Sequence, residues 1–204
     1  MGDQKLLRQA VPPTPPAGTG DIYVDDISGK LAQIVSDGSV HGAPLSNNFS
    51  VASLSIPAAD TYITNSGILV PSFGMQAGQV YRWRLTATKT AAGTAAAVYT
   101  IRIGSAQSTA DTSRLALTAT TAQTAAVSSG IIDVFVLVQT IGASGVIAGG
   151  VGVQSNNAGL GSGISGASAG FDNRSLGGSY VGLSINNGAS GAWTIETCYA
   201  ELVA

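Results

Sequence analysis

The chain has 204 residues, a formal net charge of −2 and only 10% charged side chains, against about a quarter in an ordinary soluble domain. This balance provides no long-range attraction to nucleic acid or anionic lipid. No apolar run approaches the roughly 20 residues that a membrane-spanning helix needs. With one cysteine, Cys198, and one histidine, His41, neither an internal disulfide nor a zinc site is expected. We therefore expect no nucleic-acid partner, no membrane insertion, no metal and no cofactor.

The charged side chains are unevenly distributed. Eight of the 20 acidic and basic residues lie in the first 37 positions, and none lies between Asp133 and Asp172. A surface so poor in charge must either consist of Ser, Thr, Asn and Gly or be covered by other subunits, because obligate interfaces are depleted in charge. We expect both, and hence a homo-oligomer.

Residues 1–20 are predicted to form an N-terminal arm. Four prolines in positions 12–16 favour an extended spacer with few backbone donors. Residues 3–9 can form one or two helical turns, although so short a helix is marginal in water unless a surface orders it. The arm is either a stiff linker or an anchor that docks on a larger partner. The anchor hypothesis assigns the contact to Leu6, Leu7, Arg8, Pro12, Pro13, Pro15 and Pro16.

Residues 21–46 are predicted to form a small β-hairpin module. Two short strand candidates, 21–24 and 30–35, are separated by a turn-rich loop. Asp37 and Gly38 mark a further turn. Because a single hairpin is unstable in water, it must pack on the main domain, on a partner or on other copies of itself.

Residues 47–204 are predicted to form one β domain. In 80–88, Tyr81, Trp83 and Leu85 alternate with polar side chains, which is the period of a half-buried strand. No stretch of 12 or more residues has convincing helical periodicity with caps. The predicted fold is all-β: a jelly-roll-like antiparallel sandwich preceded by the Pro-rich arm and the small hairpin. Further strands are expected at 49–56, 61–64, 67–70, 97–103, 114–120, 131–140, 145–155, 180–185 and 192–203.

Two segments of this domain have unusual patterns. Residues 131–138 are apolar on both faces apart from Asp133, which predicts a subunit contact or a further layer over the strand. The Gly-rich span 142–170 is either a mobile loop or a set of small-residue strands packed around a symmetry axis. Apolar alternation in 146–153 favours a strand there, whereas 156–166 is predicted to be a loop.

We predict that the protein is not an enzyme. A nucleophile–histidine pair can draw only on His41, in a turn-rich segment. Glycoside hydrolysis needs two neighbouring carboxylates, and an offset of five residues predicts opposite faces of a strand for Glu196 and Glu201. Asp133 either has a raised pKa or pairs with Arg82, Arg84, Arg102 or Arg114. The carboxylates considered are Asp60, Asp111, Asp133, Asp172, Glu196 and Glu201.

Two other groups of residues have simple structural interpretations. Asp25, Asp26 and Asp37 could attract a divalent cation, but their spacing matches no EF-hand loop and turn formation explains them. Aromatic residues in alternating strands are usually core, although they can also stack on sugars; those considered are Trp83, Trp193, Tyr180 and Tyr199.

The pattern Pro-Pro-Thr-Pro-Pro-Ala-Gly-Thr at 12–19, followed by Asp-Ile-Tyr-Val-Asp-Asp at 21–26 and Asp-Gly-Ser-Val at 37–40, resembles the opening module of phage tail-fibre, head-fibre and minor structural proteins. Residues 80–95, 169–173 and 181–195 resemble the C-terminal domains of the same group, and together these segments cover roughly two thirds of the chain. None of them is a chemical signature, and the group has no catalytic residues to transfer.

The resemblance implies a trimeric component of the virion surface, made in the host cytoplasm, with its N-terminus toward the particle and the sandwich outward. The chain lacks the long repetitive shaft of a tail fibre, which favours a capsid decoration protein or short head fibre bound to the capsid or another virion protein through its arm. The alternative is a tail fibre that binds a receptor or a host surface glycan. A surface depolymerase is a third, less favoured, class.

Overall fold

The computed structural model describes residues 8–9, 20–25, 31–35, 40–42, 46–71, 74–188 and 193–203, with side chains from Asn48 onward. This part of the chain is all-β, and its one helical element is a 3-10 turn, η1 (Ala158–Leu160). Among the described residues, no helix is both long and apolar enough to cross a bilayer.

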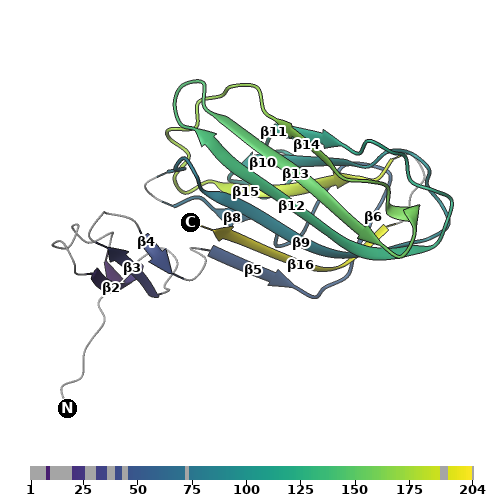
Figure 1. Cartoon of the computed structure of the whole chain (residues 1–204), viewed down its shortest axis with the longest axis horizontal. Coiled ribbons are helices and arrows are strands. Elements are labelled where there is room, and N and C mark those ends of the chain that lie inside the picture. The colour runs from purple at the N-terminus through teal and green to yellow at the C-terminus, as the bar shows by residue number, and fades with distance from the viewer. Residues whose placement is uncertain are drawn as a thin grey trace, which may run out of the picture.

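Twelve of the strands form two antiparallel sheets packed face to face (Figure 1). The seven-stranded sheet has the order β14-β13-β12-β9-β16-β5, with β6 also paired to β16, and the five-stranded sheet has the order β11-β10-β15-β7, with β8 paired to β15. The first sheet consists of β5 (Ser46–Ser50), β6 (Leu54–Ile56), β9 (Val80–Lys89), β12 (Ser128–Thr140), β13 (Val146–Ser155), β14 (Ile164–Ala167) and β16 (Trp193–Val203). The second consists of β7 (Thr61–Tyr62), β8 (Ile68–Leu69), β10 (Val98–Gly104), β11 (Thr112–Thr118) and β15 (Tyr180–Asn186).

The connectivity is that of a jelly roll. The series β5-β16-β9-β12 in one sheet faces the series β7-β15-β10-β11 in the other, so the chain crosses repeatedly between the sheets as it builds two Greek keys. Strands β13 and β14 are additional and widen the first sheet beyond β12. The predicted fold class is therefore confirmed for the sandwich.

The core follows from the alternation of the long strands. Tyr81, Trp83 and Leu85 point inward from β9 and are fully buried, as predicted. Tyr99 of β10 and Trp193 of β16 meet across the interior with ring centroids 6.5 Å apart and tilted planes. Large apolar side chains of this kind each stabilise the fold by roughly 1.5–3 kcal/mol when fully buried.

The polar atoms of the buried tryptophans are satisfied within the fold. The Trp83 indole donates to the Ser66 carbonyl (2.7 Å). The Trp193 indole donates to Oε1 of Gln123 (2.7 Å), whose amide in turn donates to the Asn187 carbonyl (2.5 Å). Because a buried donor without a partner costs about 1–3 kcal/mol, these bonds fix the loops that carry Ser66, Gln123 and Asn187 against the core.

The Gly-rich span is ordered where the structure describes it. The predicted strand at 146–153 is confirmed as part of β13. The loop predicted for 156–166 is wrong in its last residues, because β14 begins at Ile164 and pairs with β13. A Cβ at Gly150 would lie 2.8 Å from Cζ of Phe135. The small residues of β13 therefore allow a ring of the neighbouring strand to lie across it, so the close approach occurs within one subunit.

A separate small sheet has the order β1-β2-β3-β4 and lies beside the sandwich, near the start of β5 (Figure 1). Its strands are β1 (Arg8–Gln9), β2 (Gly20–Asp25), β3 (Leu31–Val35) and β4 (Val40–Gly42). The two predicted hairpin strands are confirmed as the antiparallel pair β2–β3. The helical turn predicted for 3–9 is wrong at residues 8–9, which pair in parallel with β2. Strand pairing satisfies backbone groups there, whereas so short a helix is marginal. The boundaries at 20 and 46 stay predictions.

Candidate functional site

The outer face of the seven-stranded sheet has a group of apolar side chains near one end of its central strands β12, β9 and β16. Strand register places Leu137 of β12 beside Val80 of β9, and Val80 beside Val203 of β16. Phe135 occupies the next outward position on β12 and is 47% exposed, while Leu137 is 36% and Val203 39% exposed. We call Val80, Phe135, Leu137 and Val203 the apolar patch. Residues 131–138 were expected to meet either a further layer or another subunit. The exposure of Phe135 and Leu137 shows that no further layer of the described chain covers this face, and the subunit contact stays a prediction.

Four charged side chains lie next to the apolar patch. Arg82 Nη2 is 3.4 Å from Asp133 Oδ1, and its Nη1 is 3.8 Å from Glu201 Oε1. Arg84 Nε is 3.8 Å from the same Asp133 oxygen. The predicted pairing of Asp133 with an arginine is thus confirmed, through Arg82 and Arg84. Two arginines and two carboxylates leave this part of the face with no formal net charge.

The prediction that Glu196 and Glu201 point to opposite faces is wrong. A bulge between Ile195 and Thr197 inserts one residue into the alternation of β16, which brings both glutamates to the outer face. Glu196 there accepts hydrogen bonds from the hydroxyls of Ser53 (2.5 Å) and Thr88 (3.0 Å). The two-residue alternation expected for a strand does not show where such a bulge occurs, so the sequence did not indicate it.

The remaining candidates of the β domain have structural partners. Trp83 and Trp193 are core residues, as expected, and burial raises the pKa of the Cys198 thiol to about 12. Asp172 pairs with Arg174 in an exposed loop (2.7 Å). Among the described residues, no group of three His, Cys, Asp or Glu side chains is placed to hold a metal ion.

Most of the proposed anchoring residues lie outside the described part of the chain: Leu6, Leu7, Pro12, Pro13, Pro15 and Pro16. The same holds for Asp26 and Asp37. Arg8 belongs to β1, Asp25 to β2 and His41 to β4, where the structure describes the backbone. The anchor hypothesis and the cation hypothesis stay predictions.

The outer face of the five-stranded sheet is covered over β15 by the chain's own residues, while Ala116 and Thr118 of β11 stay exposed. A Cβ at Gly182 of β15 would lie 1.9 Å from the Tyr62 hydroxyl, so that hydroxyl rests directly on the strand. Ser184 is fully buried on the same face. Burial is the largest effect on the Tyr62 hydroxyl and raises its pKa. This face is consequently not available as a flat surface.

Arg102 of β10 connects the segments that cover this face. Its Nε donates to the Ser184 hydroxyl (2.8 Å), and its Nη2 donates to Asp60 Oδ2 (2.5 Å). Its Nη1 donates to the backbone carbonyls of Thr109 (3.0 Å) and Asp111 (2.7 Å). One guanidinium therefore holds the start of β7, the loop before β11 and the centre of β15 together.

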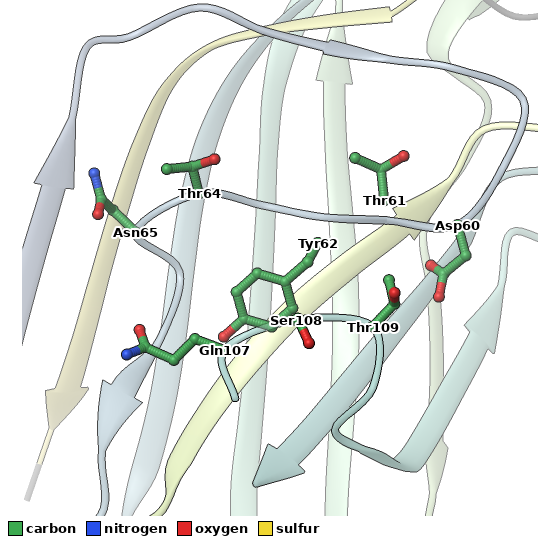
Figure 2. Close-up of a pocket in the computed structure, with 8 residues that line it drawn as sticks. All are labelled: Asp60, Thr61, Tyr62, Thr64, Asn65, Gln107, Ser108 and Thr109. Carbon is green, nitrogen blue, oxygen red and sulfur yellow. The ribbon is translucent and has the colours of Figure 1, made fainter. Parts of the chain in front are cut away.

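An open hollow of about 520 Å³ lies between these covering segments. Figure 2 shows its two walls, residues 60–65 and residues 107–109, with the Tyr62 ring between them. The lining residues are Asp60, Thr61, Tyr62, Thr64, Asn65, Gln107, Ser108 and Thr109. The sequence did not indicate this hollow, because its two walls lie more than 40 positions apart and only the jelly-roll crossing brings them together. One wall is the short strand β7 with the turn after it, and the other is the loop before β11.

Two features fix the shape of the hollow. The Asp111 carboxylate accepts hydrogen bonds from the backbone N–H groups of Ala106 (2.9 Å) and Ser108 (3.4 Å), which holds the second wall. Asn65 and Gln107 have φ values of 63° and 50°, the two positive values found for non-glycine residues in the described part of the chain. Such conformations carry a cost and persist where the surrounding structure enforces them.

The fold and these surfaces define the chain as a jelly-roll β-sandwich with one uncovered outer face and one polar hollow. No family model matches the chain, and no curated protein matches it. Among solved structures it is similar to a legume lectin-like domain from Entamoeba histolytica, with 8% identity, a TM-score of 0.25 and coverage of 77% of this chain and 91% of that domain. So low a TM-score adds nothing to the assignment of fold or function, which depends on the strand order and the surfaces above.

Proposed function

We propose that this chain is a structural, non-enzymatic component of the surface of a phage virion. In this proposal it is a trimeric capsid decoration protein or short head fibre, anchored to the particle by its N-terminal arm. The observation that carries the proposal is the apolar patch, which lies uncovered near one end of the central strands β12, β9 and β16 in a chain with only 10% charged residues.

Exposed apolar side chains are stabilised when another surface buries them, and a second copy of the same chain provides such a surface. Phe135 and Leu137 project from a central strand, so no loop of the described chain lies over them. The arginines and carboxylates beside the patch are balanced, so two copies can approach without net repulsion. Closed symmetric assembly would bury such a face on every subunit.

The jelly-roll fold supports the proposal only by analogy with other proteins that have this architecture. Viral capsid domains use this architecture, and so do lectins and cupins. A fold shared by several functional classes is compatible with a shell protein but does not select one. The sequence resemblance to phage fibre and minor structural proteins is what favours the virion over the other classes.

Adding purified protein to undecorated particles of the phage that encodes it tests the proposal. We expect copies at regular lattice positions by cryo-electron microscopy and a higher disruption temperature of the particles. A variant without residues 1–16 should remain folded and oligomeric but no longer occupy the particle. Full occupancy by this variant would contradict the anchor assignment, and absence of binding by the intact chain would overturn the decoration role.

A second candidate function is a tail fibre that binds a host receptor or glycan, and the polar hollow is the observation in its favour. Binding to host cells should then survive deletion of residues 1–20, whereas decoration of the capsid should not. Labelled protein incubated separately with cells and with undecorated capsids distinguishes the two candidates.

A further inference from the structure

We propose that the hollow between residues 60–65 and 107–109 is a binding site for a neutral saccharide. The inference deepens the second candidate function by naming the class of ligand for the same hollow, and it does not depend on the structural role. Its basis is the chemistry of the lining side chains, the local charge and the rigidity of the walls.

The lining consists almost entirely of uncharged groups that both donate and accept hydrogen bonds. Thr61, Thr64, Ser108 and Thr109 carry hydroxyls, while Asn65 and Gln107 carry amides. Figure 2 shows these polar groups spread along both walls rather than gathered at one point. A sugar carries hydroxyls, which both donate and accept hydrogen bonds, on most of its carbon atoms, so it can match such a distribution. A hydrocarbon ligand would leave the groups that it covers unpaired.

Asp60 closes one end of the hollow, next to Thr109 (Figure 2). Its Oδ2 accepts a hydrogen bond from Arg102, which fixes the carboxylate in place. Its Oδ1 is buried and has no hydrogen-bond partner among the described residues, so a ligand in the open hollow does not contact that oxygen. Recognition of a ligand therefore depends on the hydroxyls and amides along the two walls.

The charge around the hollow distinguishes between classes of saccharide. Asp60 is the one charged residue among those lining it. Its partner Arg102 donates its four hydrogen bonds to groups of the protein itself. With Asp111 behind the second wall, these three residues sum to one negative charge. A sulfated, sialylated or phosphorylated sugar would therefore meet repulsion and no free cation.

The Tyr62 ring and the fixed walls complete the site. The hydroxyl end of the ring is fixed on Gly182, and the ring lies between the two walls as an apolar surface against which a sugar can pack (Figure 2). Arg102 donates four hydrogen bonds and the Asp111 carboxylate accepts two, and these six bonds hold the walls in place. Rigid walls reduce the entropy that a ligand must overcome on binding.

The test uses the full-length chain and a panel of probes. Dextran, galactomannan and chitin oligosaccharides represent neutral saccharides, and heparin and polysialic acid represent anionic ones. Saturation-transfer NMR and a saccharide array should show binding to at least one neutral probe and none to the anionic probes. Absence of binding to every neutral probe, or stronger binding to the anionic ones, would overturn the inference.

Two variants, Thr109→Trp and Gln107→Gly, test whether binding takes place in the hollow, and Thr118→Trp is the control. Thr109→Trp fills it with an indole and should weaken binding at least tenfold. Thr118→Trp puts the same side chain at an exposed position of the same sheet, at the far end of β11, and should bind as the wild type does. Gln107→Gly removes one amide while tolerating the positive φ, and should weaken binding several-fold. If Thr109→Trp alters the denaturation midpoint, the result for Gln107→Gly decides; equal binding by that variant and wild type contradicts the site.

Discussion

The outer faces of the two sheets differ in how far the chain's own segments cover them. The five-stranded sheet is covered by its own connections, which bury Ser184, rest Tyr62 on Gly182 and converge on Arg102. The seven-stranded sheet leaves Phe135 and Leu137 exposed on a central strand. On the five-stranded sheet, segments of the same chain cover the outer face over β15. On the seven-stranded sheet, the apolar patch is uncovered in the single chain, so covering it requires another molecule.

The difference shows which side of the molecule is committed to internal stability and which to assembly. Substitutions on the covered face should change the free energy of unfolding, because the contacts there are within the subunit. Substitutions on the apolar patch should change association, because its side chains make fewer internal contacts. Each prediction below tests one side of this division.

The largest effect is expected for Arg102→Ala. The substitution removes the partner of the Asp60 carboxylate and leaves the acceptors on Ser184, Thr109 and Asp111 without their donor. Breaking a largely buried ion pair should lower the free energy of unfolding by about 2–4 kcal/mol, measured by urea denaturation. Arg174→Ala removes an exposed ion pair and should lower the free energy of unfolding much less than Arg102→Ala does. Equal midpoints for the two variants would contradict the role given to Arg102.

Gly182→Val should be the next most damaging change. The new side chain would enter the space of the Tyr62 hydroxyl, and overpacking of this kind costs about 1–3 kcal/mol. Adding Tyr62→Ala should recover part of the loss, which a double-mutant cycle measures. Gly152→Ala on the other sheet is the control, because a Cβ there would approach no atom closer than 4.0 Å. If the two glycine substitutions prove equally tolerated, the covered face is not tightly packed.

The double substitution Phe135→Ser with Leu137→Thr should separate assembly from stability. Both side chains are exposed in the single chain, so the free energy of unfolding should change by less than about 1 kcal/mol. Self-association should be lost, which sedimentation velocity over a range of concentrations reports. Val127→Ser, an exposed apolar residue outside the apolar patch, should leave the oligomer intact. A wild-type chain that stays monomeric at micromolar concentration would contradict this side of the comparison.

The smallest effect concerns pH. Hydrogen bonds from Arg174 lower the pKa of Asp172 from its ordinary value of 3.8 to about 2. Because the folded-state pKa is the lower one, the pair's contribution to stability is present above pH 3.8 and is lost as the pH falls toward 2. NMR titration of the Asp172 carboxyl should show the low midpoint, and Arg174→Ala should return it to the ordinary range. An unchanged midpoint in that variant would assign the shift to another cause.

The sandwich could be predicted from the sequence because its long strands alternate cleanly. Tyr81, Trp83 and Leu85 share one face of β9 by counting in twos, and the same count locates the inward rows of β10 and β12. Counting in twos gave a wrong expectation at two places in the chain. A bulge at Glu196 brought both glutamates of β16 to the same face, and glycines concealed the short strand β14.

The candidate surfaces were predictable to different degrees. The uncovered face of β12 was visible as an apolar run that carried Asp133, and the arginine partners followed from charge alone. The hollow was not predictable, because it brings together two turns on either side of β9 and β10. No local pattern in 60–65 or 107–109 distinguishes these polar residues from any other surface loop.

The two strands added to the jelly roll change how the wider sheet ends. Without β13 and β14 the sheet would terminate at β12, which is 13 residues long; with them it terminates at β14, which has four. A long terminal strand offers a row of unpaired N–H and C=O groups on which another chain can extend the sheet without limit. Shortening that row restricts fibre-like growth in the plane of the sheet, so further copies must add through side chains, where the number of neighbours can be controlled.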